Sequence, residues 1–471
     1  MENKKKVRIT DRHRALLTET LPFEKLFPFT NVSFHSSVNK YMNSLPSLLE
    51  KLLITTSYTI PYDYHITSKH GSSRVLSIIH PAKQIEISSF YEKNKDYILY
   101  LCSKSEFSLR RPFANFKYYY ADNESKDEEN VLDNDGNVET AGDPFSTESS
   151  TYRSFFVYKP YSYLFNFYDS WKFLHIEKKF KYLEMLDISK CFYNIYTHTI
   201  GWSVKDKWYA KSNSGKGKIS FESEFDRLMM ESNYNETNGI VVGPEISRIF
   251  AEIILQRVDQ NVSRKLHSAG IKIKENYTIC RYVDDYFIFT NNLSVRDKVI
   301  EALKSELVKI KLYINEGKTE SYERPFMTSE SNAKIEISRV IDEFFEKAIT
   351  AEGYNKYFNP RLSCNQLLQN IKKCVTANKI DFSSISRYAL QSISSIAKKT
   401  LKSSTITDDQ SIELSHYLIN VMFVLYSYDS NYRTTNIICL FFLDIFNHFK
   451  IENSKVKPNI ARVFLSRQQT T

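Results

Sequence analysis

Two adjacent aspartates interrupt an otherwise apolar, β-prone segment at residues 277–290, whose sequence is Tyr-Thr-Ile-Cys-Arg-Tyr-Val-Asp-Asp-Tyr-Phe-Ile-Phe-Thr. The pattern predicts a β-hairpin with Asp284 and Asp285 at its tip. Adjacent carboxylates between buried strands repel each other and resist desolvation, so both stay ionised only if a cation compensates their charge. Mg²⁺ suits oxygen ligands of this kind. The alternative for this segment alone is an ordinary Asp-Asp hairpin turn that binds no metal.

A third carboxylate, Asp187, ends another apolar, strand-like run at residues 180–187, and a turn into a helix follows it. Two Mg²⁺ ions about 3.5–4 Å apart need acids from more than one strand, together with phosphate oxygens of a substrate, to drive in-line phosphoryl transfer. We therefore expect Asp187 and Asp284 to bridge such ions, with Asp285 in support.

A further segment, beginning at Gly243 and Pro244, has the start signal and the apolar periodicity of an amphipathic helix. Small residues recur every four positions along it, at Gly243, Ser247 and Ala251. Such a ridge lets another group approach closely, which is either a template base with the nascent pair or a neighbouring helix. The residues themselves leave both possibilities open.

Lys318 follows a short strand-like run and lies in a polar turn. A lysine beside a metal-bound pyrophosphate can act as the general acid for the leaving group. The alternative is an ordinary surface lysine.

Charge is distributed unevenly along the 471 residues, whose net charge is +9. The stretch 121–144 holds nine acidic residues and one lysine, a net charge of −8, so the remainder carries +17. A basic body with 32 Phe, 32 Tyr and 3 Trp suits a polyanion with stackable bases, although most aromatic side chains form core. The six cysteines lack the spacing of a zinc site, and no glycine-rich phosphate loop is present.

The chain is two to three times the usual size of a domain. We expect an α+β body at residues 1–345, with a flexible acidic insertion at 121–150, followed by an all-helical domain at 346–471. No apolar run approaches 18 residues and no signal peptide is visible, so we expect an intracellular protein without a membrane span.

Taken in order, the four pieces from Asp187 to Lys318 resemble the palm of a reverse transcriptase. The tetrapeptide at 282–285, Tyr-Val-Asp-Asp, matches the signature of that family, and the strand before Asp187 and the helix at Gly243 accompany it. The resemblance implies a fingers and palm core, with a helical C-terminal domain in place of a thumb. It also implies an RNA-directed DNA polymerase, a nucleotidyltransferase that uses dNTPs and two Mg²⁺ ions.

The same resemblance implies roles for individual residues. The sequence at 107–112, Phe-Ser-Leu-Arg-Arg-Pro, is similar to the fingers motif whose basic residues grip the incoming triphosphate. Phe192 occupies the steric-gate position, where an aromatic ring favours deoxynucleotides. The implied metal ligands are Asp187, Asp284, Asp285 and the backbone carbonyl of Ile188, and the implied nucleotide-binding residues are Arg110, Arg111, Lys190, Cys191, Phe192, Gly243 and Ser247.

Two positions depart from the family pattern. Val242 and Arg248 stand where Gln and Pro are usual, so we expect the template to be gripped differently. Glu24 is a candidate for contact with an incoming base, and its alternative is a buried glutamate at a helix entry.

Within the family, the chain is similar to bacterial defence-associated reverse transcriptases of the abortive-infection type. The branch it resembles is the second polymerase subunit of a two-polymerase, type-three defence system. That resemblance implies a bacterial cytoplasmic protein that makes DNA without a conventional template or from a protein primer. It further implies homo-oligomers, a companion reverse transcriptase and a structured noncoding RNA. The similar stretches are residues 17–24, 107–112, 195–200 and 233–255.

Two other functions remain open from the sequence. One is a conventional RNA-templated reverse transcriptase, and the other is a non-catalytic subunit that uses the palm to bind RNA. The intact set of three carboxylates argues against the second, because an inactive palm gains nothing from three mutually repelling acids.

Overall fold

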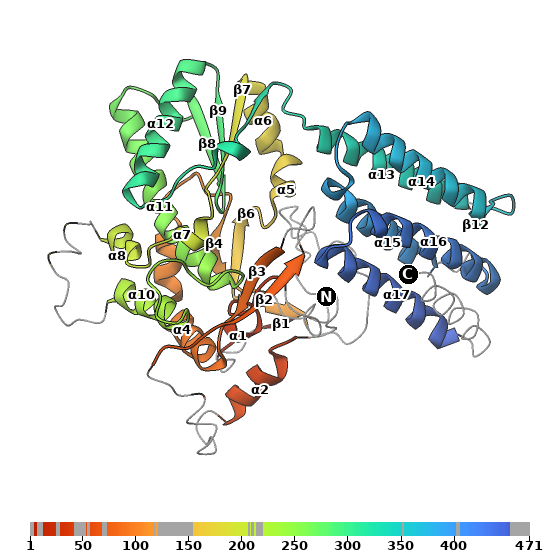
Figure 1. Ribbon diagram of the computed structural model, residues 1–471, viewed down its shortest axis with the longest axis horizontal. Coiled ribbons are helices and arrows are strands. Elements are labelled where there is room, and N and C mark those ends of the chain that lie inside the picture. The colour runs from red at the N-terminus through yellow and green to blue at the C-terminus, as the bar shows by residue number, and fades with distance from the viewer. Residues whose placement is uncertain are drawn as a thin grey trace. The chain divides into compact units, whose positions relative to one another are not determined.

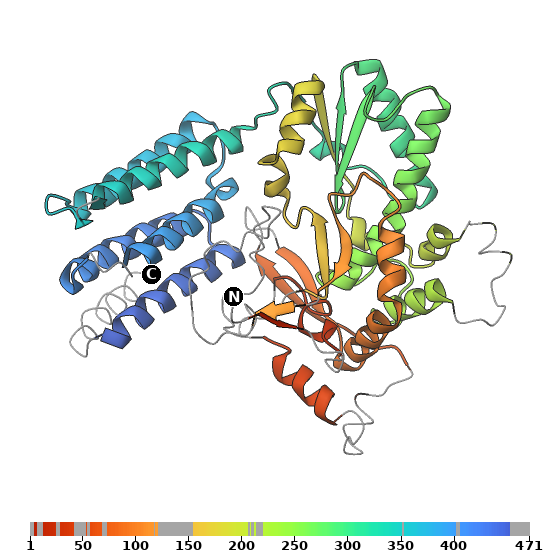
Figure 2. The same ribbon diagram turned by 180° about the vertical axis from the view of Figure 1, so that it is seen from behind.

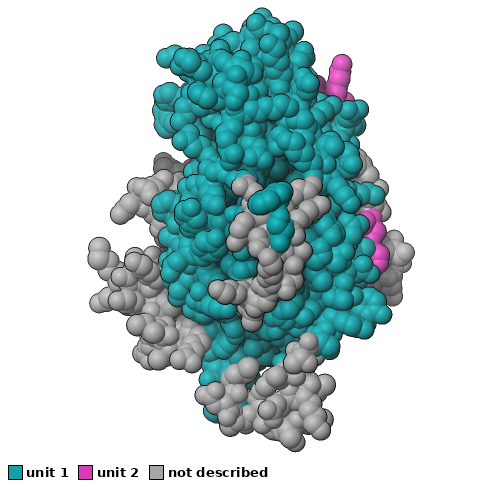
Figure 3. Space-filling model, turned by 90° about the vertical axis from the view of Figure 1, so that its left-hand side faces the viewer, with its two compact units in different colours: residues 1–64, 75–326 teal, residues 65–74, 327–471 magenta. Residues whose placement is uncertain are grey.

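The computed structural model describes most of the chain as two compact units. Unit 1 comprises residues 1–64 and 75–326, and unit 2 comprises residues 65–74 and 327–471; Figure 3 shows one face of unit 1 as a continuous body. The described residues are 4–6, 13–24, 29–41, 53, 57–67, 73–116, 118–120, 154–205, 208, 212, 220–350, 353–401 and 406–452. The acidic insertion expected at 121–150 lies outside them. None of the described helices combines the length and the apolar character that crossing a membrane requires.

Unit 1 is built on a four-stranded antiparallel sheet with the strand order β10-β7-β9-β8. Figure 1 labels β7, β8 and β9 of this sheet, and Figure 2 shows the chain from behind. The strands are β7 (Tyr182–Asp187), β8 (Tyr277–Tyr282), β9 (Asp285–Thr290) and β10 (Glu320–Glu323). β8 and β9 form the hairpin that the sequence predicts, with Val283 and Asp284 as its connection. β9 is therefore an interior strand, paired with β7 on one side and with β8 on the other.

The interior strand β9 is apolar on both faces, and each face packs on different helices. Tyr286 and Ile288 belong to the core that includes the buried sides of α11 and α12, whereas Phe287 and Phe289 pack with aromatic residues of α5 and α6. Because successive side chains of a strand point to opposite faces, a continuous apolar run is what a strand buried on both sides needs. The helices are α5 (Leu164–Tyr168), α6 (Trp171–Lys179), α11 (Glu245–Ser268) and α12 (Leu293–Lys309).

A two-stranded ribbon and a long helix lie beside this sheet. β4 (Arg110–Asn115) pairs antiparallel with β6 (Phe156–Pro160), and α4 (Pro81–Cys102) packs against β4. The His80 side chain caps α4 by accepting a hydrogen bond from the Ala82 amide at 3.2 Å. The other elements before residue 326 are β1 (Lys4–Lys6), α1 (Ala15–Thr18), α2 (Val32–Tyr41), β2 (Tyr62–Thr67), β3 (Ser73–Ile78), β5 (Tyr118–Tyr120), α7 (Cys191–Asn194), α8 (Thr199–Val204), α10 (Phe221–Glu231) and the 3₁₀ turn η2 (Glu316–Lys318).

Unit 2 is mainly helical and has a core cluster of its own. Its elements are α13 (Ser329–Ala348), β11 (Ile349–Thr350), β12 (Gly353–Tyr354), α14 (Pro360–Ala377), the 3₁₀ turn η3 (Phe382–Ser384), α15 (Ser386–Leu401), α16 (Asp408–Tyr428) and α17 (Tyr432–Glu452). α13 packs on α14 and α15, while α16 and α17 pack on α15 and on each other. Thr328 and Asn359 cap α13 and α14 through side-chain oxygens, as helix starts favour. The expected fold class, α+β with a helical C-terminal region, is confirmed.

The compact units divide after Phe326, before the boundary expected after residue 345. α13 places Ala333, Ile337 and Ile341 in the core of unit 2. Phe326, by contrast, packs in the aromatic cluster on β9. A division after residue 345 would cut through α13, so the packing moves the boundary to the segment that precedes this helix.

Candidate active site

The ends of β7 and β9 bring two of the three aspartates together. Asp187, the last residue of β7, is paired in register with Asp285, the first residue of β9. Asp284 precedes Asp285 in the turn, and its carbonyl oxygen accepts a hydrogen bond from the Ile188 amide at 3.3 Å. Segments far apart in the chain thus present their carboxylates at the same end of the sheet.

The β8–β9 connection has an unusual backbone conformation. Val283 has a φ of 57°, in the left-handed region, where a β-branched residue is rarely found. The pairing of Tyr282 with Asp285 closes the turn. The Tyr282 hydroxyl donates to the carbonyl oxygen of Ser162 at 2.8 Å. The turn is therefore held by the pairing of β8 with β9 and by the contact of Tyr282 with the segment after β6.

Lys318 lies beside the aspartates and pairs with one of them. Its Nζ donates to Asp187 Oδ2 at 2.9 Å. This hydrogen bond raises the pKa of Lys318 against the opposing effect of partial burial, and the charges of Asp187, Asp285 and Asp284 raise it further. The amine therefore stays protonated at neutral pH.

Burial and mutual repulsion disfavour the ionised aspartates of the turn. Burial raises the pKa of Asp285 to about 7, with further contributions from the charges of Asp284 and Asp187. Burial, followed by the charge of Asp187, also raises the pKa of Asp284, although a backbone hydrogen bond opposes the shift. Carboxylates in this condition are typical of sites that function with a cation.

The chemistry of this group fits a hard divalent cation. Three carboxylates and the neighbouring backbone carbonyls are oxygen donors of the kind that Mg²⁺ prefers. Among the residues that the structure describes, however, no three His, Cys, Asp or Glu side chains are grouped as a metal site. Asp187 is hydrogen-bonded to Lys318, so an ammonium group supplies positive charge beside this carboxylate.

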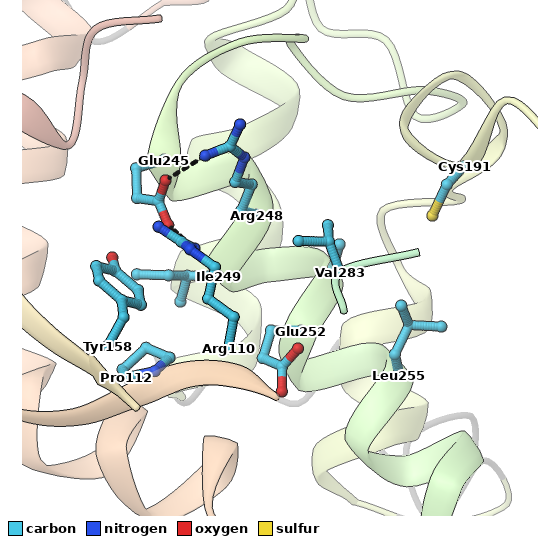
Figure 4. A pocket seen from close by; sticks show the side chains of 11 residues that line it. Arg110, Pro112, Tyr158, Cys191, Glu245, Arg248, Ile249, Glu252, Leu255 and Val283 are labelled. Carbon is cyan, nitrogen blue, oxygen red and sulfur yellow. Dashed lines mark hydrogen bonds and ion pairs between the residues drawn. The ribbon is translucent and has the colours of Figure 1, made fainter. Parts of the chain in front are cut away.

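A pocket beside the turn is lined by Arg110, the first of the two arginines expected to bind a triphosphate, and by Val283 (Figure 4). Arg110 Nη1 lies 2.6 Å from Glu245 Oε1, and Arg248 Nη1 lies 3.0 Å from Glu245 Oε2. The Arg110 guanidinium also lies over the Tyr158 ring, 4.0 Å from its centroid. Glu245 therefore holds two guanidinium groups at the first turn of α11.

Two glutamates near this pocket have opposite pKa shifts. Burial favours the neutral form of Glu245, but the charges and hydrogen bonds of Arg110 and Arg248 outweigh it and lower the pKa of Glu245. Glu19 is buried and accepts hydrogen bonds from a backbone amide at 2.8 Å and from the Tyr158 hydroxyl at 3.1 Å. Burial, followed by the charge of Glu245, raises the pKa of Glu19 to about 7.

Gly243 and Ser247, the small residues expected to admit a close neighbour, are packed against the chain itself. A Cβ on Gly243 would lie 2.9 Å from the Cβ of Pro22, and Gly243 has a φ of 123°. Ser247 is buried, and its Oγ donates to the carbonyl oxygen of Val241 at 2.5 Å. Pro22 also forms an isolated bridge with Pro244. The neighbour at Gly243 is therefore the N-terminal segment, and not a helix.

The residues at 190–192 continue from Asp187 toward this pocket. Lys190 has a left-handed φ of 47° and precedes α7 as its N-cap. Cys191 is buried and lines the pocket, and Phe192 is half-buried against the main core of unit 1. Cys191 thus links the end of β7 to the pocket that contains Arg110.

Arg111 and Glu24 have different surroundings. Arg111 is half-buried, and its guanidinium carbon lies 5.9 Å from the centroid of the Phe113 ring. Glu24 is buried, and its backbone carbonyl accepts a hydrogen bond from the Tyr64 hydroxyl. Contact between Glu24 and a base would therefore require the buried carboxylate to become accessible.

Glu245 and Tyr158 are site residues that the sequence interpretation did not assign. Glu245 had a local signal, since an acid in the first turn of a helix is favourable and Arg248 stands three residues later. Tyr158 had none, because only the pairing of β4 with β6 places its ring under Arg110.

Solved telomerase structures are distantly similar to this chain. Apo telomerase from Candida tropicalis is 11% identical, with a TM-score of 0.37, and the match covers 93% of this chain and 73% of the telomerase chain. Telomerase from Candida albicans in complex with the TWJ fragment of telomeric RNA is 12% identical, with a TM-score of 0.34 and coverage of 93% and 70%. No curated protein matches the chain in sequence.

One family model matches residues 144–335, less than half of the chain, and is described as Reverse transcriptase (RNA-dependent DNA polymerase). The matched range contains the whole four-stranded sheet and therefore Asp187, Asp284, Asp285 and Lys318. The reverse transcriptase fold and the enzyme class expected from the sequence are thereby confirmed. The chain carries a reverse transcriptase domain, the nucleotidyltransferase domain of RNA-directed DNA polymerases.

Proposed function

We propose that this protein is a Mg²⁺-dependent DNA polymerase of antiphage defence, which synthesises DNA without a conventional template or from a protein primer. The observation that carries the polymerase part is the register of the central sheet, which pairs Asp187 with Asp285. The reverse transcriptase match over residues 144–335 supports the same chemistry.

The carboxylates of Asp187, Asp284 and Asp285, with the carbonyl of Ile188, would hold the metal ions. When bound, divalent cations neutralise the charge that develops on the transferred phosphoryl group and activate the attacking hydroxyl. Lys318 gives up its contact with Asp187 in this proposal, so that its ammonium becomes free to meet a phosphate oxygen. The exchange is feasible because the Lys318 side chain is 68% exposed.

In the reaction the attacking hydroxyl gives its proton to solvent water and its oxygen joins the α-phosphorus of a dNTP. The bond from that phosphorus to pyrophosphate breaks. Lys318 donates a proton to the departing pyrophosphate oxygen in this proposal. A lysine ammonium keeps its proton at neutral pH, so the donor is protonated before the reaction.

The fingers arginines and the residues after Asp187 would bind the nucleotide. Phosphate oxygens compete with Glu245 for the Arg110 guanidinium, whose planar fork suits either anion. Arg111 offers a second guanidinium, Phe192 acts as the steric gate, and Lys190 and Cys191 bind the nucleotide beside them in this proposal. Gly243, packed against Pro22, and the buried Ser247 contribute by fixing the start of α11.

Incorporation of labelled dNTPs tests the polymerase proposal. We expect the purified full chain to yield DNA product with Mg²⁺, and the variant that combines Asp284→Ala with Asp285→Ala to yield none. Asp297→Ala is the matched control, because it removes an acid of α12 that is 64% exposed, and it should keep the product. Unchanged product in the double variant would overturn the assignment of the site.

Sequencing the product, with and without added RNA, tests the mode of synthesis. Template-independent synthesis predicts the same product sequence in both reactions, and Glu24→Gln should alter it if Glu24 contacts the incoming base. A product that copies the added RNA would favour a conventional reverse transcriptase. Salt-sensitive RNA binding without incorporation would favour a non-catalytic subunit. DNA bonded to the protein would support priming by a side-chain hydroxyl.

The defence role is supported by the sequence similarity to defence-associated reverse transcriptases described above. We accordingly propose a bacterial cytoplasmic location, a companion reverse transcriptase, a noncoding RNA and a homo-oligomer. Purification of the tagged protein from its host, followed by mass spectrometry and RNA sequencing, tests these partners. Recovery of the protein as a monomer without RNA or a second polymerase would contradict them.

A further inference from the structure

A buried arginine lies directly behind the aspartate turn and has no part in the chemistry proposed above. Arg281, in β8, has a side chain that is 0% exposed. Its Nη1 donates to the carbonyl oxygen of Val283 at 3.0 Å. Val283 is the turn residue with the left-handed φ of 57°, a conformation that persists only where the surroundings impose it. The arginine therefore holds the strained part of the turn.

Two acids of α11 fix the guanidinium in place. Glu252 accepts hydrogen bonds from Nη1 at 2.7 Å and from Nη2 at 3.2 Å, and Asp259 accepts from Nη2 at 2.9 Å and from Nε at 3.0 Å. The Tyr286 hydroxyl in turn donates to Asp259 at 2.9 Å. Because the planar guanidinium is bonded on two edges, its contact with Val283 connects the turn rigidly to α11.

The same contacts keep the arginine charged. Burial favours loss of its proton, but the charges of Asp259 and Glu252 outweigh this effect and raise the pKa of Arg281. A charged donor makes a stronger hydrogen bond to a carbonyl than a neutral donor does. If Arg281 served only to neutralise Glu252 and Asp259, it would not need to donate a hydrogen bond to the Val283 carbonyl.

We propose that Arg281 is the positioning residue of the aspartate turn: by holding the Val283 carbonyl against α11, it sets how Asp284 and Asp285 present their carboxylates to divalent cations. This inference rests on the proposed polymerase function. Arg281 acts through Val283 and touches neither substrate nor metal. Loss of such an outer contact typically costs about 10- to 100-fold in metal affinity or activity.

Three variants separate positioning from charge balance. Arg281→Lys keeps the charge but cannot serve both acids and the Val283 carbonyl, because an ammonium lacks the forked geometry. A triple variant that combines Arg281→Met, Glu252→Gln and Asp259→Asn removes all three charges, so that no buried ion is left unpaired and the fold is retained. Tyr286→Phe is the matched control, because it removes a hydrogen bond to Asp259 and leaves the Val283 contact intact.

Binding of Mn²⁺ to each full-length variant without nucleotide, followed by electron paramagnetic resonance, provides a readout that does not depend on catalysis. We expect both Arg281 variants to bind Mn²⁺ about tenfold or more weakly, with kcat for dNTP incorporation reduced to a similar degree. The KM for dNTP, measured at saturating Mg²⁺, should change by less than about threefold, because Arg110 and Arg111, which bind the triphosphate in the proposed function, are not displaced. Tyr286→Phe should stay within about threefold of the wild type in every measurement.

The outcomes separate this inference from the function on which it rests. Wild-type Mn²⁺ binding and kcat in the folded triple variant would overturn the positioning role and leave charge balance as the task of Arg281. An active wild type that Arg281→Lys does not impair would overturn it as well. A wild-type protein that incorporates no dNTP would overturn the proposed function, and the inference with it.

Discussion

Gly243→Ala should destabilise the protein through two effects that can be measured separately. The φ of 123° at Gly243 is one that a residue with a side chain rarely adopts. An added Cβ would also lie 2.9 Å from Pro22 Cβ and 3.2 Å from Pro22 Cγ, too close for undisturbed packing. The backbone conformation costs about 1–3 kcal/mol, and the overlap adds about 1–3 kcal/mol. The free energy of unfolding should therefore fall by about 2–6 kcal/mol.

Two comparison variants separate these contributions. Gly270 has a φ of 77° and no atom within 4 Å of an added Cβ, so Gly270→Ala should carry the backbone cost alone, about 1–3 kcal/mol. Pro22→Gly removes the overlapping atoms, so its combination with Gly243→Ala should be less destabilising than the two single changes added together, by about 1–3 kcal/mol. Urea unfolding followed by circular dichroism gives these free energies where the slopes of the transitions agree.

Two results would refute the reasoning. One is a cost of Gly243→Ala no larger than that of Gly270→Ala. The other is additivity of Pro22→Gly and Gly243→Ala within about 0.5 kcal/mol, which would mean that the two residues do not interact. Either result would instead favour the alternative in which Gly243 lies open to a template base. In that case its substitution should impair nucleotide binding more than stability.

Three further predictions concern charged groups. The pKa of Glu19 is raised to about 7 from about 4.3 in an unfolded chain, so its ionisation lowers the free energy of unfolding as the pH rises from 5 to 8. Urea unfolding at both pH values should show a weaker dependence in Glu19→Gln, and equal dependence would contradict the shift. Glu245→Gln should cost about 1.5–3 kcal/mol, because Arg110 loses its carboxylate; an unchanged urea midpoint would refute the ion pair. Lys318→Met should slow single-turnover incorporation at saturating dNTP by about 10²–10⁴-fold, and a wild-type rate would exclude Lys318 as the proton donor.

The central hairpin could be predicted because its signal is local. The apolar runs on both sides of the aspartates identify two strands, and the continuous run in β9 indicates burial on both faces. The register of β7 on β9 is not local. It depends on Leu183 joining the aromatic cluster of Phe287 while Leu186 joins the core of Ile288, and a shift by one residue would exchange these faces. The need for metal ligands from more than one strand predicted that Asp187 lies near the turn. Its pairing with Asp285 is seen only in the fold.

The partner of Arg110 could not be predicted, because it comes from a distant segment. Arg110 is bonded to Glu245, and the chain offers many acids that could have taken that place. The neighbour of Gly243 is likewise Pro22, which lies in a segment without periodic apolar signals. Contacts of this kind depend on how β4, α11 and the N-terminal segment are brought together.

Helical periodicity located the C-terminal helices but not every break between them. The apolar pattern continues from residue 412 to 449, whereas the chain turns between α16 and α17 at Asp429. The Asp429 carboxylate accepts hydrogen bonds from Ser386 and from Asn431 Nδ2, the latter at 2.7 Å. The turn is thus set partly by a residue of α15, which no local pattern reveals.

Iron-directed cleavage of the backbone tests the central claim most directly. In this measurement Fe²⁺ takes the place of Mg²⁺ and, with ascorbate, generates hydroxyl radicals that cut the chain beside the bound ion. We predict cuts near Asp187 and near Asp284, and we predict that excess Mg²⁺ suppresses both. Cuts elsewhere, or cuts that persist when Asp187 and Asp285 are both replaced by alanine, would contradict a metal site formed by the end of β7 and the β8–β9 turn.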